Sequence, residues 1–402
     1  MEKQESVLKI FSFRKVIIPI LIGLFVAAYL IIKDFHKPVF QDVQTGKGEY
    51  YWVDINNDGA KTIDELFSAN ETHKGDINIV KQSSIMKTII SRWSWYSTAC
   101  LFIALCFGIM RDFMYMYRIR LLSDKQLSWR QSFEVIMLWE FGSSVTPSVV
   151  GGSALAFFIV AKEGISAGRS TAIVMITALL DELFYIIITP IILIFVGINT
   201  AFITDFDFSA FGSTFGIRSI FTIGYGFMLL LTIFILVAIF IYPQGFRKFL
   251  YSIGKRKVLK RWQCKFNKMG DDIVISSNEF KGKGFWFWTK AYGCTVFSWT
   301  SRFFVVNCLL LAFSPVSDHL LVYARQLVMW IILCISPTPG SSGIAEFAFP
   351  IFLKEFLPLG TAATLSLLWR IYTYYPYILA GLIVLPLWTK RTFSTNNRKI
   401  QN

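Results

Sequence analysis

The stretch Ser336-Pro337-Thr338-Pro339-Gly340-Ser341-Ser342-Gly343-Ile344-Ala345-Glu346 places two prolines, two glycines, three serines and a carboxylate inside a strongly apolar region. Proline and glycine interrupt helical hydrogen bonding, and in hydrocarbon the freed backbone groups must be satisfied by surrounding protein or by a water-filled cavity. A carboxylate at membrane depth is costly and is therefore a candidate functional group. The stretch predicts a broken helix beside a polar cavity in a membrane protein.

A second copy of this region lies 192 residues earlier in the chain. A shift of 192 positions places Thr146-Pro147 on Thr338-Pro339 and Gly151 on Gly343. Between positions 146 and 168, nine of 23 residues are identical to their counterparts, whereas chance gives roughly one or two. The sequence therefore predicts an internal repeat.

The composition excludes an ordinary soluble protein. The chain has 402 residues, is 54% hydrophobic and only 16% charged, and has a mean hydropathy of +0.52, whereas soluble domains are about 25% charged. The net charge of +14 does not indicate a nucleic-acid partner, because eleven Lys or Arg and only three acids gather between Gln244 and Gly284. Such clustering beside apolar runs is typical of a cytoplasmic loop, which we expect to contact anionic lipid headgroups.

The apolar runs predict an all-α polytopic protein of about six full spans. The expected spans are Val16–Ile32, Trp93–Met110, Ser170–Val196, Ser219–Tyr242, Phe285–Phe313 and Thr361–Trp388. The second span is followed by a basic stretch that includes Arg111 and Arg118. We expect the protein to lie in the inner (cytoplasmic) membrane. The charges of the loops predict that both termini face the cytoplasm. The predicted segments are an N-terminal stub and first span (1–32), a polar extracytoplasmic insert (33–91), transmembrane repeat 1 (92–243), a basic cytoplasmic loop (244–284), transmembrane repeat 2 (285–388) and a cytoplasmic tail (389–402).

Two further apolar regions are interrupted. Residues 131–160 break at 142–147 and again at Gly151-Gly152, and residues 320–335 and 344–353 flank the opening stretch. Each half is too short to cross a bilayer of about 30 Å, so two re-entrant hairpins are expected. Counting the crossings makes them enter from opposite sides, as in the inverted repeats of transporters. The alternative is that the breaks are packing kinks in ordinary spans.

Charged residues within the apolar runs form the candidate substrate pathway, because each costs about 2.5–3.5 kcal/mol at the bilayer centre unless it is paired or faces water. The repeat offset places Arg370 on Ala178, one turn from Asp181 and Glu182, and predicts an ion pair across the repeats. Arg302 and Arg370 suit a phosphate, Arg325 is interpreted as a snorkelling surface residue, and a purely structural ion pair is the alternative for the acids. The predicted pathway residues are Glu140, Thr146, Pro147, Gly151, Gly152, Asp181, Glu182, Arg302, Pro339, Gly340, Gly343, Glu346 and Arg370.

The polar insert contains a candidate calcium loop at residues 54–65. Asp54, Asn56 and Asp58 occupy positions 1, 3 and 5 of an EF-hand-like pattern, Gly59 permits the turn, and Glu65 occupies position 12. These oxygens suit a hard cation. The alternative is an Asx-rich turn between short elements. Calcium is the one cofactor that the sequence suggests.

Residues 336–346 resemble the Pro-x-Pro-Gly-Gly-x-Gly-x-x-Glu signature of the lysylphosphatidylglycerol synthase/flippase transmembrane family. Residues 130–173 resemble the first half of that family, with a Pro-x-x-x-Gly-Gly break followed by Lys-Glu-Gly-Ile-Ser, and residues 368–372 resemble its final span. Pro339, Gly340, Gly343 and Glu346 are the matched positions, while Ser341 replaces the second glycine of the signature.

The resemblance implies a flippase-like transporter of lipids or lipid-linked substrates, whose partners are membrane lipids. No soluble aminoacyl-transferase domain follows residue 388, so synthesis of a lysyl-lipid is not expected. Two alternatives remain open, a membrane-embedded transferase acting on a lipid-linked substrate and a calcium-responsive membrane scaffold.

Overall fold

The computed structural model describes residues 39–55, 63–70, 73–80, 93–146, 148–202, 207–210, 213–256, 263–334, 338–358 and 361–401, with positions 25, 90 and 336. The predicted first span lies outside these residues apart from Phe25. The helices are, in chain order, α4 (Trp95–Leu122), α5 (Trp129–Val145), α6 (Ser148–Lys162), α7 (Ala167–Val196), α8 (Ile198–Ala201), α9 (Ile217–Leu236), α10 (Pro243–Gly254), α11 (Gln263–Lys281), α12 (Phe285–Phe313), α13 (His319–Cys334), α14 (Ile344–Leu353), α15 (Ala362–Thr373) and α16 (Tyr375–Gln401).

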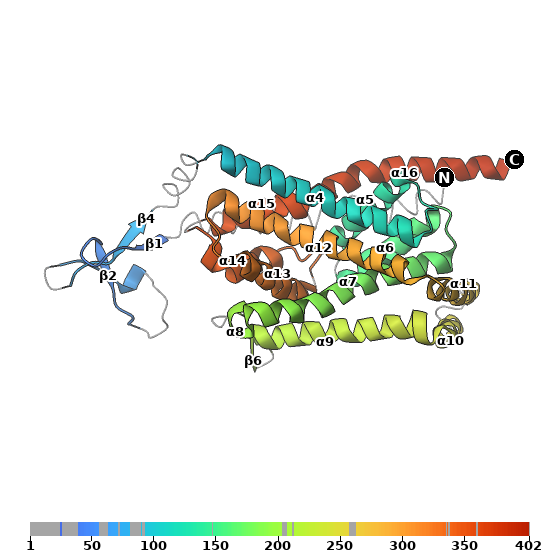
Figure 1. The fold of residues 1–402 in the computed structure, drawn as a ribbon, viewed down its shortest axis with the longest axis horizontal. Helices are drawn as coiled ribbons and strands as arrows, with labels where there is room; N and C mark the ends of the chain where they lie inside the picture. Colours follow the sequence, from blue (N-terminus) through green and yellow to red (C-terminus); the bar gives the residue numbers. More distant parts are fainter. Residues whose placement is uncertain are drawn as a thin grey trace.

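The mostly helical architecture confirms an all-α membrane protein (Figure 1). Within the described residues, five segments are long and apolar enough to cross a membrane, and they coincide with five of the six predicted spans. They are α4, α7, α9 with the π-helical turn Val237–Ile241 that continues it, α12, and the segment Ala362–Thr392 formed by α15 and α16. Their exposed side chains are largely Phe, Ile and Leu, as expected for helices that face lipid.

Helix α4 corrects the prediction of a cytoplasmic basic stretch after Met110. The helix continues without interruption to Leu122, because no Pro or Gly stands between residues 109 and 122. Arg111 and Arg118 are consequently buried inside the bundle rather than placed in a loop. The helix ends at Ser123, followed by Asp124 and Lys125 with positive φ.

Helices α4 and α12 pack along each other in opposite directions. Trp93, two residues before the start of α4, contacts Phe313 at the end of α12, and Phe107 contacts Phe304 further along. Deeper in the bundle, the Ser298 hydroxyl donates to the Arg111 carbonyl at 3.1 Å. Figure 1 shows the two helices side by side along the length of the molecule.

The helix boundaries repeat at the spacing that the sequence indicated. Adding 192 to the bounds of α4, α5, α6 and α7 gives 287–314, 321–337, 340–354 and 359–388. The observed helices at these places are α12 (285–313), α13 (319–334), α14 (344–353) and the pair α15–α16 (362–401). The difference is that α7 is a single helix, whereas its counterpart is divided into α15 and α16 at Tyr374.

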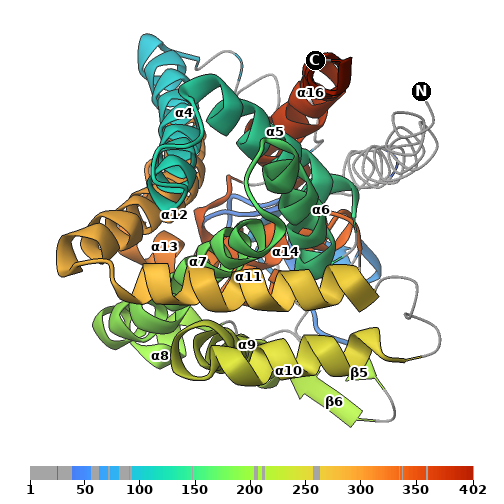
Figure 2. The same ribbon diagram turned by 90° about the vertical axis from the view of Figure 1, so that its right-hand side faces the viewer.

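The described part of the basic segment 244–284 consists mainly of two helices, α10 and α11. Helices α10 and α11 pack against each other and lie across the long helices, so they are seen end-on in Figure 1 and lengthwise in Figure 2. Pro243 opens α10 at a position that tolerates its missing N–H. Leu250 is buried, whereas Lys248 and Phe249 are exposed. The pair therefore covers one end of the bundle.

The described part of the insert at the opposite end is a small antiparallel sheet of order β1-β4-β2-β3. Ile77 of the inner strand β4 is 1% exposed and packs at the centre of the sheet. The strands are β1 (Val39–Asp42), β2 (Tyr50–Trp52), β3 (Leu66–Ser68) and β4 (Ile77–Val80), and a short hairpin of β5 (Asp207–Ala210) and β6 (Ser213–Gly216) lies between α8 and α9.

Close packing of α16 on α5 requires a glycine at position 381. A Cβ there would lie 2.1 Å from Cγ of Phe141, a fully buried ring that has no room to move. We expect Gly381→Ala to destabilise the protein by about 1–3 kcal/mol, as overpacking does, and to lower the midpoint of thermal unfolding in detergent. Gly108→Ala is the matched control, because a Cβ at that helical position meets no atom within 4 Å. Equal unfolding midpoints for the two variants would contradict this packing.

Candidate functional site

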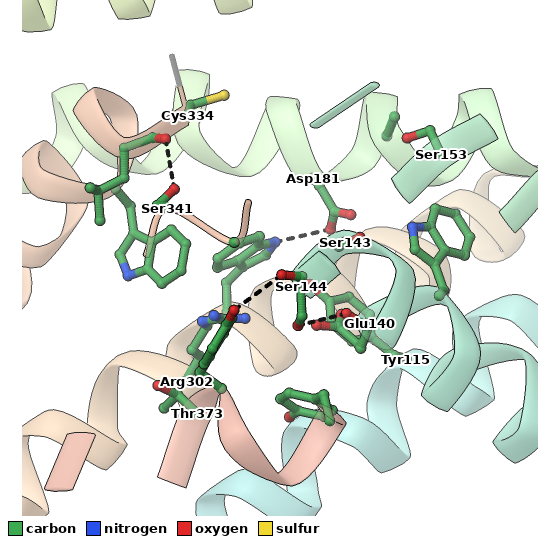
Figure 3. Close-up of a pocket in the computed structure, with 18 of the residues that line it drawn as sticks. Tyr115, Glu140, Ser143, Ser144, Ser153, Asp181, Arg302, Cys334, Ser341 and Thr373 are labelled. Carbon is green, nitrogen blue, oxygen red and sulfur yellow. Dashed lines mark hydrogen bonds between the residues drawn. The ribbon is translucent and has the colours of Figure 1, made fainter. Parts of the chain in front are cut away.

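A cavity of about 630 Å³ lies inside the bundle between the two copies of the repeat. Its wall is formed by α4, α5, α6, α7, α9, α12, α13, α15, α16 and the stretch after α13. Figure 3 shows labelled side chains from several of these helices pointing into it. The lining includes a set of ionisable and aromatic residues: Arg111, Tyr115, Arg118, Glu140, Asp181, Glu182, Trp299, Arg302, Trp330, Arg370, Tyr374 and Tyr377.

Arg118 of α4 is paired with Asp181 of α7. Its two terminal nitrogens donate to the two carboxylate oxygens at 2.6 and 3.1 Å, the bidentate geometry that makes arginine–carboxylate pairs strong. Trp299 of α12 donates its indole N–H to the same carboxylate at 2.9 Å, and Thr295 accepts from Arg118 at 2.7 Å. Three helices are thereby joined at one charge pair.

Arg111, about two turns earlier on the same face of α4, is paired with Glu140 of α5 at 2.7 Å. It also donates to Asp112 at 2.7 Å and to the Tyr377 hydroxyl at 2.5 Å. Arg111 is 3% exposed, so its charge is compensated by two carboxylates rather than by water.

Arg302 of α12 differs from the other arginines of the cavity. No carboxylate oxygen among the described residues lies within ion-pair distance of it. Its Nε–H, like that of Arg111, is buried without an acceptor. The guanidinium instead lies over the Trp330 ring at 4.2 Å and near the Trp299 ring at 5.6 Å. Aromatic faces stabilise a cation but do not neutralise it. The cavity therefore presents a positive charge.

Glu182 is the acid of the cavity that has no arginine beside it. The carboxylate is 8% exposed and accepts a hydrogen bond from the Thr232 hydroxyl of α9 at 2.8 Å. Within the described chain, no Lys, Arg or His forms an ion pair with it.

The opening stretch of the sequence is held by Arg370, and the predicted pairing of Arg370 with Asp181 or Glu182 is wrong. The Arg370 Nε donates to Glu346 at 2.7 Å, and the other carboxylate oxygen accepts the Gly343 N–H at 2.7 Å. Glu346 is 2% exposed and does not line the cavity. The pair lies within one copy because the division of the final span at Tyr374 places Arg370 against α14.

The backbone of this stretch explains its glycines. Gly340 has a φ of +54° and Gly343 a φ of +85°, conformations that favour glycine. Ser341, which replaces the second glycine of the signature, also has a positive φ of 54°. Its hydroxyl donates to the Leu333 carbonyl at 3.2 Å, an interaction that a glycine would lack and that offsets part of the strain.

The broken regions of the two copies meet at Tyr374. Its hydroxyl donates to the Ser144 carbonyl at the end of α5 at 3.1 Å and accepts from Ser342 at 3.0 Å. The Tyr374 hydroxyl thus forms hydrogen bonds with a backbone carbonyl of the first copy and with a serine side chain of the second. A Cβ at Gly340 would lie 2.4 Å from this ring, so the contact also depends on that glycine.

Repeat-equivalent acids lie at opposite ends of the bundle. Glu163 after α6 contacts Arg391 of α16 and accepts the Trp388 N–H at 2.6 Å. Its counterpart Glu355, after α14, pairs with Arg325 at 2.8 Å. Arg325 is 4% exposed, so its interpretation as a snorkelling surface residue is wrong.

The cavity gathers some of the predicted pathway residues and leaves others outside. Gly152 supports the contact of α6 with α5, because a Cβ there would lie 2.1 Å from the Ser143 hydroxyl. Pro147 and the surroundings of Gly151 lie outside the described residues. The lining contains Glu140, Thr146, Asp181, Glu182, Arg302, Gly340 and Arg370 but not Gly152, Pro339, Gly343 or Glu346.

Sequence reasoning missed Arg111 and Arg118 as cavity residues. Their spacing was the available signal, because positions 111, 115 and 118 lie at i, i+4 and i+7 on one helical face. That face carries two arginines and a tyrosine in a run otherwise rich in Phe, Met and Ile.

The candidate calcium loop is described only at its ends. Strand β2 precedes it and a short 3₁₀ turn, Ile63–Glu65, leads from it into β3. Glu65 is 3% exposed and accepts from the Trp52 indole at 3.2 Å. Asn56 and Asp58 lie outside the described residues, so binding of calcium by this loop stays a prediction.

Breaking the Arg370–Glu346 pair has a predictable cost. Arg370→Gln leaves a buried carboxylate without its partner, and we expect a loss of about 3–5 kcal/mol of stability. Glu346→Gln combined with Arg370→Gln removes both charges and should recover part of the thermal unfolding midpoint in detergent. The matched control is Arg130→Gln, because Arg130 has a 74% exposed side chain in its pair with Glu134, and such pairs contribute about 0–1 kcal/mol. A double variant less stable than Arg370→Gln alone would contradict the pairing.

Comparison with known proteins agrees with this architecture. The sequence profile described as the lysylphosphatidylglycerol synthase TM region matches residues 80–381. A UPF0104 membrane protein of Archaeoglobus fulgidus is 27% identical over 312 residues, which cover 75% of this chain and 89% of the relative. No solved structure matches. The profile match spans most of the chain and includes every residue that lines the cavity, and the chain therefore belongs to the lysylphosphatidylglycerol synthase transmembrane-region family.

Proposed function

We propose that this chain moves a lipid or a lipid-linked substrate across the cytoplasmic membrane, and that its cavity binds an anionic headgroup. The observation that carries the proposal is Arg302. Arg111, Arg118 and Arg370 are each compensated by a carboxylate, whereas Arg302 lies over Trp330 and has no carboxylate partner among the described residues. Its buried Nε–H has no acceptor. A phosphate oxygen would satisfy that donor, and arginine binds phosphate in a forked geometry.

The duplication supports transport. Transporter folds place the substrate site between repeats of opposite orientation, at interrupted helices. Helices α4 and α12 occupy matching positions of the two copies and run antiparallel, as inversion requires. Helices α5 and α14, with 17 and 10 residues, are about 26 and 15 Å long, short of a bilayer core of about 30 Å. Re-entrant hairpins account for both lengths.

The distribution of Lys and Arg along the bundle supports a particular orientation of the protein in the membrane. Helices α10 and α11 form the end of the bundle that carries the basic segment 244–284, and the end of α16 lies at the same end in Figure 1. The opposite end carries the sheet of the insert and the β5–β6 hairpin. We place the basic end in the cytoplasm, where anionic headgroups attract Lys and Arg.

The test is leaflet exchange in proteoliposomes that contain a fluorescent anionic phospholipid. Arg302→Gln should slow exchange by about 10–100-fold, because a hydrogen bond to a charged group contributes about 1.5–3 kcal/mol and about 1.4 kcal/mol corresponds to tenfold. Arg302→Lys should give an intermediate rate, since it keeps the charge but loses the forked donors. Arg130→Gln is the control outside the cavity.

The same vesicles distinguish the alternatives. Exchange of the unmodified lipid supports transport, whereas a lipid recovered with an added or removed group would indicate a transferase. Wild-type exchange no faster than in protein-free vesicles, with correctly folded protein, would reject transport of this lipid class.

A further inference from the structure

We propose that Glu182 is a proton-binding site at the cavity wall, and that its proton is exchanged as the cavity opens and closes. The inference adds coupling to protons to the proposed transport. Only this coupling rests on the proposed function. The proton site itself follows from the contacts of Glu182.

Three other acids of the bundle, the partly buried Asp181 and Glu140 and the buried Glu346, show how an ionised carboxylate is compensated here. Asp181, Glu140 and Glu346 each contact an arginine at 2.6 or 2.7 Å. An unpaired carboxylate buried in a low-dielectric interior is far less stable than its neutral acid form. Each of these three carboxylates is therefore compensated by an arginine.

Among the residues that the structure describes, no helix that packs around Glu182 contributes a cation to it. Helix α9 contributes the Thr232 hydroxyl, which donates at 2.8 Å. Helix α13 contributes the thiol of Cys334, a group without positive charge. Its own helix contributes Asp181, a like charge that is already occupied by Arg118 of α4. A neutral carboxylic acid fits these surroundings, and a carboxylate does not.

The position of Glu182 allows the proton to leave. The residue lines the cavity, so water in the cavity can accept the proton from the carboxyl oxygen and leave a carboxylate. A closed, dry cavity favours the neutral acid, and an open, hydrated cavity favours the carboxylate. Because binding of the proton favours one conformation over the other, a proton gradient shifts the equilibrium between them. Acidic residues inside membrane proteins commonly form such proton relays.

Infrared spectroscopy of the full-length protein tests the proton site without any transport. At neutral pH, the wild type should show a carbonyl band of a protonated carboxylic acid, which disappears in Glu182→Gln. Glu49→Gln is the matched control, because Glu49 is exposed in the insert and its removal should leave the band unchanged. A wild-type spectrum without such a band, or a band that persists in Glu182→Gln, would overturn the proposal.

Proteoliposomes with an imposed pH gradient test the coupling. Leaflet exchange by the wild type and by Glu49→Gln should change at least about threefold with the gradient, whereas Glu182→Gln should retain exchange that is independent of it. Wild-type exchange that ignores the gradient would overturn the coupling while leaving the proposed transport intact. A different result would be that Glu182→Gln abolishes exchange at every pH and still shows the carbonyl band of the wild type. In that case the Glu182 carboxylate binds the substrate, and the proton site is rejected. Absence of exchange in the wild type would reject the transport function, and the infrared result would still decide the proton site.

Discussion

The guanidinium of Arg370 is the contact on which the interrupted part of the bundle depends. It compensates the buried carboxylate of Glu346 and donates to the Gly340 carbonyl at 3.0 Å. It also lies over the Tyr374 ring at 4.1 Å, and that tyrosine links the stretch to the end of α5. An interrupted helix at membrane depth is stable only when its free backbone groups form hydrogen bonds with surrounding protein or water. Arg370 satisfies several of these groups in the second copy, and Glu346, Ser341 and Tyr374 satisfy others, so the wall of the cavity beside them is well connected.

The two copies share a backbone plan but differ in chemistry. Their helix boundaries agree at an offset of 192, and Glu163 and Glu355 both pair with arginines. The division of the final span into α15 and α16 has no counterpart in α7, and it positions Arg370 against its own copy. Within the described residues, Asp181 is paired with Arg118, whereas Glu182 has only the Thr232 hydroxyl as a side-chain partner. The charges that line the cavity are therefore not distributed symmetrically between the two segments.

Periodicity and composition predicted the membrane class and the positions of five spans, because apolar length is a local property of the chain. The partners of the buried charges were not predictable in the same way. Arg370 was expected beside Asp181 on the basis of the repeat offset, but a break of one residue at Tyr374 changed which helix it faces. Arg111 and Arg118 were assigned to a loop, since arginine usually ends a span. Their burial depends on carboxylates contributed by α5 and α7, and such long-range pairing leaves little trace in local sequence.

The stacking of Arg302 on Trp330 and Trp299 has a consequence for binding kinetics and selectivity. A free arginine side chain loses about 1.5–2 kcal/mol of rotamer entropy when a ligand orders it. Here the rings hold the guanidinium in place beforehand, so preorganisation spares an arriving anion that loss. The same rings present flat, water-poor surfaces beside the charge. Under the proposed function, this geometry would favour a ligand that joins a compact anion to an apolar body over a fully hydrated inorganic ion.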